Sequence, residues 1–166
     1  MKWDYIGVAP IKIYLLAIGK SMPKWIEQGF AEYAKRLPKT YQLELIEVSA
    51  KKRNKSTSLQ RILQEESLDL LNKIPANTYI IALDEHGKEW STLELSQQLQ
   101  KWHDAGQDIA ILIGGADGLS QEILQQAHKV WSLSKLTFPH ALVRVILAEQ
   151  LYRAWSIIQK HPYHRA

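Results

Sequence analysis

Short apolar runs alternate with longer segments of helical periodicity along almost the whole chain. The apolar runs lack the polar alternation of a half-exposed strand, which predicts strands that are covered on both faces. Turn residues such as glycine bound several of them. The pattern predicts about five strands, at residues 11–18, from near 41 to 48, 78–83, 108–113 and 130–133.

Helical spacing fills the intervals between the predicted strands. In the first interval, apolar residues from Ile26 to Leu37 recur on one helical face, with Pro23 at the predicted first turn and Pro38 after the end. The last helical segment is the longest, with an apolar stripe from residue 143 to 158. The other predicted helices lie at residues 59–71, 93–102 and a short stretch from about 120.

Strands that alternate with helices predict an α/β domain with a mainly parallel sheet and helices on both faces. A chain of 166 residues fits one domain of about 150 residues. In such sheets, ligands bind beyond the carboxyl ends of the strands. The loops predicted at those ends are residues 84–90, 114–120 and 134–140.

The amino-acid composition excludes several kinds of site and of cellular location for this chain. The absence of cysteine excludes disulfides, a cysteine nucleophile, iron–sulfur clusters and thiolate zinc sites. The most apolar late stretch, residues 142–151, contains Arg144 and Glu149 and is too short to cross a bilayer. The first ten residues lack the pattern of a signal peptide. We therefore expect a cytoplasmic protein that does not enter a membrane.

The net charge of +4 conceals an uneven distribution. Residues 20–61 carry ten basic and four acidic side chains, residues 62–127 carry three and eleven, and residues 128–166 carry six and one. If the two basic ends meet in space, they form a face suited to phosphates; the alternative is an ordinary solvated surface. The RNA-binding candidates are four basic residues of one predicted loop: Lys51, Lys52, Arg53 and Lys55.

Two predicted loops have compositions suited to a ligand. LIGGADG (112–118) places three glycines between a strand and a helix, where backbone can approach a ligand, but it matches neither GxGxxG nor a phosphate loop, and a tight turn is the alternative. In SLSKLTFPH (132–140), Leu136 and Phe138 suit an adenine ring or a thioether. The alternative there is a helix start with Thr137 as cap and Pro139 in the first turn.

Long motifs in the C-terminal half resemble one known family. LIGGADG, WSLSKLTFPHALVRVILAEQLYRAWSI (131–157) and HPYHR (161–165), in this order, resemble the RlmH family of SPOUT methyltransferases. The resemblance extends from about residue 11 to the end and includes YLLAIGKSMPKW (14–25) and IALDEHGKEW (81–90). It makes residues 11–166 a single SPOUT domain and residues 1–10 an extension without an assigned role.

The resemblance implies a C-terminal trefoil knot, a homodimer and S-adenosylmethionine as methyl donor. It also implies methylation at N3 of a pseudouridine in 23S ribosomal RNA, within the large subunit or the assembled ribosome. The chain departs from the family pattern at Ala116 and Asp117, where proline and glutamate are common. The family's cofactor positions correspond here to Leu83, Gly114, Gly115, Gly118, Ser134, Lys135, Leu136, Thr137, Phe138 and Pro139.

Methyl transfer to an imide nitrogen needs a route for the N3 proton, which nearby cations or a positioned base provide. The candidates are Arg153, His140, Tyr163, His164 and Arg165. Each has a structural alternative: an ion pair of Arg153 with Glu149, packing of His140 at its helix start, and binding of RNA phosphates by the tail. His161 and His164 supply only two ligands, so we expect no metal ion.

The last predicted helix carries apolar residues on a second face, namely Leu142, Val145 and Ile146. This second face predicts a homodimer in which the C-terminal tail of one subunit completes the cofactor pocket of the other. Two other functions remain open on the residues alone. One is a noncatalytic ribosome-binding protein that uses the basic face, and the other is an α/β methyltransferase with another substrate.

Overall fold

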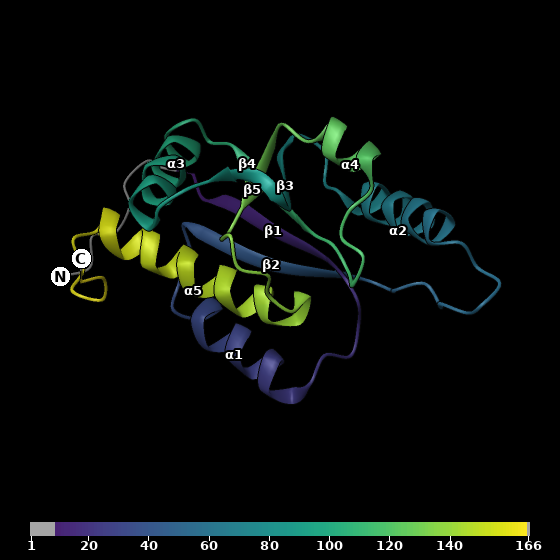
Figure 1. Ribbon diagram of the computed structural model, residues 1–166. Coiled ribbons are helices and arrows are strands. Elements are labelled where there is room, and N and C mark those ends of the chain that lie inside the picture. Colours follow the sequence, from purple (N-terminus) through teal and green to yellow (C-terminus); the bar gives the residue numbers. More distant parts are fainter. Residues whose placement is uncertain (1–8, 166) are drawn as a thin grey trace.

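Strand and helix alternate strictly along the computed structural model, which describes residues 9–165. The strands form one parallel sheet in the order β2-β1-β4-β3-β5 (Figure 1). They are β1 (Ile11–Ile18), β2 (Tyr41–Val48), β3 (Thr78–Glu89), β4 (Asp108–Ile113) and β5 (Lys129–Ser132). The helices are α1 (Lys24–Ala34), α2 (Leu59–Lys73), α3 (Thr92–Asp104), α4 (Gln121–Gln126) and α5 (His140–Ile158).

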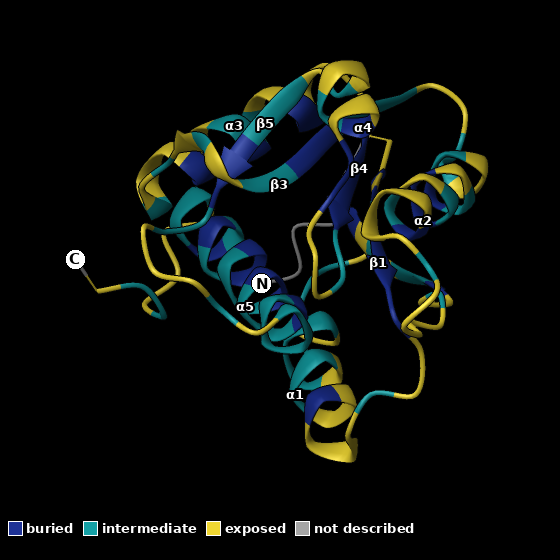
Figure 2. Cartoon of the chain, turned by 45° about the vertical axis from the view of Figure 1, so that its right-hand side comes forward, coloured by how far each residue is buried: buried dark blue, intermediate teal, exposed yellow. Residues whose placement is uncertain are grey.

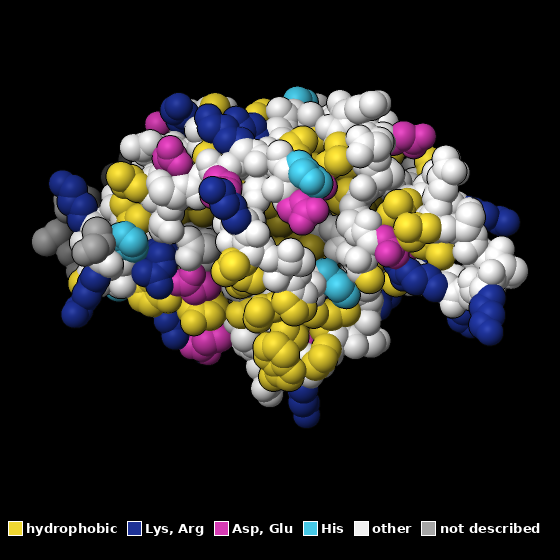
Figure 3. Space-filling view, in the orientation of Figure 1, with side chains coloured by type: hydrophobic (Ala, Val, Ile, Leu, Met, Phe, Trp, Pro, Cys, Tyr) yellow, Lys and Arg dark blue, Asp and Glu magenta, His cyan; other side chains and the backbone are white. Residues whose placement is uncertain are grey.

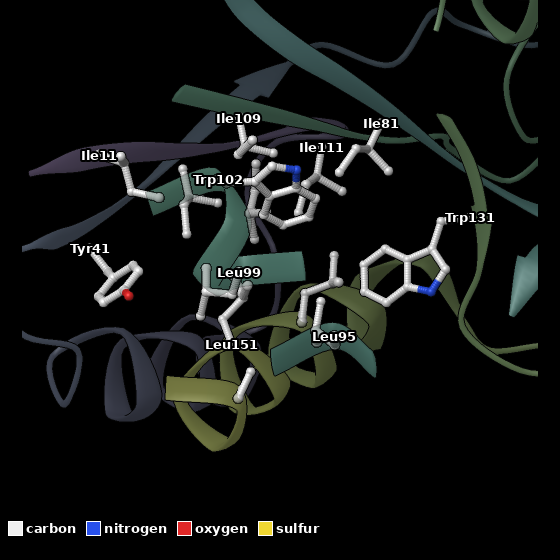
Figure 4. Packing of buried hydrophobic residues seen from close by; sticks show 14 of the residues in the cluster. Ile11, Tyr41, Ile81, Leu95, Leu99, Trp102, Ile109, Ile111, Trp131 and Leu151 are labelled. Atoms are coloured by element: carbon white, nitrogen blue, oxygen red, sulfur yellow. The ribbon is translucent and has the colours of Figure 1, made fainter. Parts of the chain in front are cut away.

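Helices cover both faces of the sheet, which explains the continuous apolar runs. Helices α1, α3 and α5 lie on one face, and α2 and α4 lie on the other (Figure 1). Leu15 and Ala17 of β1 belong to the core beneath α3 and α5, whereas Leu16 and Ile18 belong to the core beneath α2 and α4. The central strands β1 and β4 are the most buried strands (Figure 2), and Figure 4 shows the packing between the sheet, α3 and α5.

The predicted α/β class, the parallel sheet and the covered faces are confirmed. The prediction of a loop at residues 84–90 is wrong, because β3 continues to Glu89 with a register shift between Leu83 and Lys88. A Cβ atom on Gly87 would lie 2.7 Å from the carbonyl carbon of Val130, so glycine is needed where the two backbones approach. Most side chains of this stretch are exposed, which explains why its composition resembles a turn.

The trefoil knot and the limits of the domain stay predictions. Residues 1–8 of the predicted extension, and Ala166 at the other end, lie outside the described residues. Within the described part, no helix is long and apolar enough to span a bilayer.

The order of the strands creates a switch point between β1 and β4. The chain leaves β1 through α1 to reach β2 on one side, while β4 lies on the other side of β1. Connections that leave a parallel sheet in opposite directions open a crevice beyond the carboxyl ends of the two strands, where ligands bind in such folds. Gly19 follows β1 and Gly114 follows β4 at this place.

Two leucines of α2 test whether this helix covers the second face. Leu70 is fully buried and Leu68 is exposed on the same helix. We expect Leu70→Ala to lower the free energy of unfolding by about 2 to 5 kcal/mol, because it removes buried methyl groups and leaves a cavity. The matched variant Leu68→Ala should change it by no more than about 0.5 kcal/mol. Equal losses in urea denaturation would contradict this packing.

Candidate functional site

One cavity of about 540 Å³ opens at the carboxyl ends of β4 and β5 and beside the middle of β3. This volume is in the range of small-molecule sites in proteins. Three segments line it: the middle of β3, the glycine loop after β4, and the final loop between β5 and α5. These segments contain the three places that strand order predicted for a ligand. The lining includes Leu83, Gly114, Gly115, Gly118, Ser134, Leu136, Thr137, Phe138 and Pro139.

Nine of the ten residues expected at a cofactor therefore line one cavity, and the tenth does not. Lys135 is exposed and is not part of the lining. Its neighbours on either side, Ser134 and Leu136, do line the cavity, so the loop places this side chain away from it.

The glycine loop is both a tight turn and a wall of the cavity. Gly118 N–H donates to the Gly115 carbonyl at 3.1 Å, and Gly118 has a positive φ of 76°. A Cβ atom on Gly114 would lie 2.5 Å from the carbonyl carbon of Gly118, which no side chain tolerates. The two interpretations of LIGGADG are thus compatible, because the glycines that close the turn also expose backbone to the cavity.

The final loop is held by its own serines. Ser132 Oγ donates to the Ser134 carbonyl at 3.0 Å, and Ser134 Oγ accepts from the Leu136 N–H at 3.0 Å. The prediction of Thr137 as a helix cap is wrong, because α5 begins after Pro139 without any side-chain cap. Thr137 stands two residues before that cap position, too early to reach the free N–H groups of the first turn.

Acidic groups surround the cavity, and one of them pairs with the basic loop (50–56). Asp84, Glu85 and Asp117 are lining residues. Arg53 Nε donates to Asp117 Oδ2 at 2.7 Å, which joins the basic loop to the glycine loop. Figure 3 shows acidic and histidine side chains near the centre of this face and hydrophobic side chains over α1 and the start of α5.

The basic loop is anchored by two of its four candidate RNA-binding residues. Lys51 N–H donates to Glu66 Oε2 at 2.9 Å, and its ammonium pairs with Asp69 at 2.8 Å. Arg53 is held by Asp117 as described above. Lys52 and Lys55 are exposed and form no ion pair with any described residue, so they are free to contact an external anion.

His140 is the only catalytic candidate that lines the cavity of the described chain. Burial lowers the pKa of its imidazole, and the nearby cations Arg144 and Arg53 lower it further, against an opposing effect of Glu66. The imidazole is therefore neutral at neutral pH and able to accept a proton.

The remaining catalytic candidates gather at the other end of α5. Arg153 pairs with Glu149 at 2.6 Å, and its guanidinium lies 4.8 Å from the ring centroid of Tyr163. His164 Nδ1 lies 3.3 Å from Arg153 Nη1. Arg153 follows His140 by thirteen residues on one helix, a separation of about 20 Å. One subunit therefore does not bring these groups to the cavity. Arg165 is exposed beyond them.

The two basic segments, residues 20–61 and 128–166, come together in one place, where the Arg36 guanidinium lies 5.7 Å from the ring centroid of Tyr152 on α5. The basic loop and the carboxyl end of α5 lie at opposite ends of the molecule, and lysine and arginine side chains gather at both places (Figures 1 and 3). The formation of one basic face for RNA by the two segments therefore stays a prediction. Among residues 9–165, no group of three histidine, aspartate or glutamate side chains is placed to hold a metal ion.

Comparison with known proteins identifies the family. The family model described as "Predicted SPOUT methyltransferase" matches residues 11–164. The chain belongs to the SPOUT methyltransferase family. A protein of Nitrosococcus oceani named ribosomal RNA large subunit methyltransferase H is 50% identical over 156 residues, covering 94% of this chain and 99% of that protein. A protein of the same name from Hahella chejuensis is 48% identical, with 93% and 99% covered.

Solved structures with similar folds include two methyltransferase-like proteins. A probable methyltransferase of Bordetella pertussis has a TM-score of 0.54 at 14% identity, covering 87% of this chain and 94% of that one. A probable methylase family protein of Haemophilus influenzae has a TM-score of 0.52 at 15% identity, covering 95% and 71%. At these identities the likeness concerns the fold alone, and it agrees with membership of the SPOUT family.

Sequence reasoning missed several charged groups of the SPOUT site. Asp84 and Glu85 follow the predicted strand 78–83, and this position was a usable signal although β3 continues to Glu89. Glu66 and Arg144 carried no such signal, because each lies in a helix and becomes relevant only through tertiary packing. Both are almost completely buried, at 3% and 1% exposure.

Glu149, Arg153, Tyr163 and His164 form a cluster at the carboxyl end of α5, here called the tail cluster. In this cluster, the pKa of the Tyr163 phenol is shifted. Burial, followed by a hydrogen bond to Glu149, raises the pKa of Tyr163 to about 12. In a spectrophotometric titration, the difference between the wild type and Tyr163→Phe should show a phenol that ionises near pH 12. The stability that this shift provides is present below pH 10 and is lost as the pH rises to about 12. A difference midpoint near pH 10 would contradict this arrangement. The control is Tyr14→Phe on β1, which should leave the transition near pH 12 in place.

Proposed function

We propose that the chain is an S-adenosylmethionine-dependent methyltransferase that methylates N3 of a pseudouridine in 23S ribosomal RNA and works as a homodimer. The observation that carries this proposal is the cavity lined by nine of the ten expected cofactor residues. The relatives named ribosomal RNA large subunit methyltransferase H, at 48% to 50% identity over almost their full length, support ribosomal RNA as the substrate.

The cavity has the chemical character that S-adenosylmethionine requires. Glycine backbone at 114 and 115 leaves room for close approach, and Leu136 and Phe138 offer apolar surface to the adenine or the thioether. Asp84 and Glu85 place negative charge beside it, which favours a ligand that carries ammonium and sulfonium groups. When bound, this cofactor supplies a methyl group on a positively charged sulfur, which needs no metal ion.

His140 is the group of this chain that we assign to the N3 proton. It lines the cavity, and its lowered pKa keeps it neutral and ready to accept a proton at the pH of the cell. Tyr163 keeps its proton up to about pH 12, so its phenol acts as a hydrogen-bond donor and not as a base. Arg153 keeps its charge, because the hydrogen bond to Glu149 raises its pKa.

The basic loop is suited to position the RNA. Lys52 and Lys55 form no ion pair with a described residue. They extend from the basic loop, which Lys51 and Arg53 anchor beside the cavity. Phosphate contacts of this kind position RNA without reading its sequence. The distance between the cavity and the tail cluster supports a dimer in which each tail reaches the cavity of the other subunit.

The alternatives explain less of the structure. A noncatalytic ribosome-binding protein would use the basic residues but needs no glycine-walled cavity. A methyltransferase for a free metabolite would use the cavity but needs no exposed lysines beside it. The proposed RNA methyltransferase uses both features.

The decisive experiment combines labelled S-adenosylmethionine with large subunits or assembled ribosomes that lack the modification. We expect label at N3 of one pseudouridine of 23S RNA. Gly114→Ala should weaken S-adenosylmethionine binding about tenfold or more in calorimetry, equivalent to about 1.4 kcal/mol, because the added Cβ displaces the loop.

The control is Gly106→Ala, which strains a turn with positive φ but meets no atom within 4 Å. Gly106→Ala should lower stability and leave cofactor binding unchanged. If the protein binds the cofactor but does not label RNA, the RNA substrate is refuted and another substrate is favoured. If it does not bind the cofactor, the noncatalytic alternative is favoured.

Complementation tests the dimer. A chain that ends at Lys160 lacks the tail and should be inactive alone, and Gly114→Ala has a weakened cavity and should be nearly inactive alone when S-adenosylmethionine is kept well below the concentration that saturates this variant. Co-expression should restore about a quarter of wild-type activity, because half of the dimers are mixed and each has one intact site. Methyltransferase activity should not recover in cells that express two copies of the same variant. A tail-less chain that is fully active alone would refute the shared site.

A further inference from the structure

Arg144 is an unusual residue for a surface helix, because its guanidinium is buried at 1% exposure. Its Nη2 donates to the Gly19 carbonyl at 2.8 Å, just after the end of β1. Its Nη1 pairs with Glu47 Oε2 at 2.6 Å, near the end of β2. One side chain of α5 therefore binds the carboxyl ends of two neighbouring strands.

The same contacts lie against His140, one helical turn earlier. The Arg144 Nη2 and His140 Cε1 atoms lie 3.5 Å and 3.8 Å from the position that a Cβ atom would take on Gly19. Gly19 has a φ of 115°, which side-chain-bearing residues rarely adopt, and its N–H donates to the Val48 carbonyl at 2.6 Å. Histidine, arginine and a fixed turn of backbone thus meet at the switch point between β1 and β4.

Among residues 9–165, no hydrogen bond of the His140 side chain holds the ring in place. Its Nδ1 is buried and has no partner among the described residues. The helix start offers no substitute, because Pro139 lacks an N–H group and no side chain caps α5. One turn later, Arg144 attaches this end of α5 to β1 and β2 through hydrogen bonds and an ion pair.

We propose that Arg144 is a positioning residue for the methyl-transfer site, because it ties the first turn of α5 to the ends of β1 and β2 and so fixes His140 at the cavity. A planar guanidinium suits this task, since its separate N–H groups reach a carbonyl and a carboxylate at once. The catalytic consequence rests on the proposed function, whereas the placement of His140 does not.

Arg144 also determines the charge environment of His140. The charged groups that act on this imidazole are Arg144 on α5, Arg53 on the basic loop and Glu66 on α2. The two cations disfavour the imidazolium, and Glu66 favours it. The second oxygen of Glu66, Oε1, is buried without a partner among the described residues, so its charge is not offset by another hydrogen bond.

Three variants separate the effect of Arg144 on the position of the His140 ring from the effect of its charge on the His140 pKa. Arg144→Met removes both, Arg144→Lys keeps the charge but cannot reach both acceptors, and Glu66→Gln leaves the attachment intact. The His140 ring signals, assigned with His140→Gln, are followed by NMR through a pH titration. A nuclear Overhauser contact between His140 Hε1 and the Gly19 Hα protons reports the position of the ring.

We expect the contact to Gly19 to persist in Glu66→Gln and to be lost in both Arg144 variants. The His140 pKa should rise in both Arg144 variants, by less in Arg144→Lys because the cation is kept, and should fall further in Glu66→Gln. General loosening cannot produce that fall, because exposure to water raises the pKa of this histidine. Arg61→Met, which removes an exposed pair with Glu65, should change neither signal.

For methyl transfer, kcat should fall about tenfold to a hundredfold in both Arg144 variants while the KM for S-adenosylmethionine stays within about twofold, as expected for a displaced group. An unchanged contact to Gly19 together with an unchanged kcat in Arg144→Met would overturn the proposal. If the wild type transfers no methyl group, the proposed function fails, and the NMR signals still decide the placement of His140. If Arg144→Met does not fold, Arg144→Lys and Glu66→Gln carry the test.

Discussion

The parallel order of the strands is the constraint on which the rest of the structure depends. Because all five strands run the same way, their carboxyl ends share one edge, and segments that are distant in sequence meet there. The cavity is therefore built from β3, the glycine loop and the final loop, which are separated by up to about fifty residues of chain. Parallel strands also need helices on both faces, and α5 is the helix that starts at the cavity.

Close backbone contacts turn this arrangement into a specific site. Gly87 lets β3 run along β5 without a side chain between them, and Gly114 lets the glycine loop fold back on Gly118. A Cβ atom at either place would meet backbone at 2.7 Å or less, and backbone does not yield as a flexible side chain does. Both glycines therefore fix where the walls of the cavity stand, in addition to permitting a turn.

Periodicity and strand order predicted most of this fold from the sequence. Five buried strands, five helices and their alternation followed from runs of apolar residues, because burial on two faces leaves a continuous signal. The continuation of β3 past Leu83 was hidden, since its polar residues are exposed and its pairing partner is distant in sequence. The lining residues followed from motifs, whereas Arg144 and Glu66 did not, because a buried charge is defined by what packs around it.

The charge pattern acquires a physical meaning from the fold. The acidic middle of the sequence supplies Asp84, Glu85 and Asp117 to the cavity, where negative charge favours a cationic ligand. The basic segment before it supplies the loop that stands next to this cavity and presents Lys52 and Lys55 to the solvent. Arg53 joins the two regions, because its guanidinium pairs with Asp117 while the loop around it remains basic. In the proposed function, the carboxylates that favour a cationic cofactor and the lysines that favour RNA phosphates therefore lie only a few residues apart, at short range where salt screening is weakest.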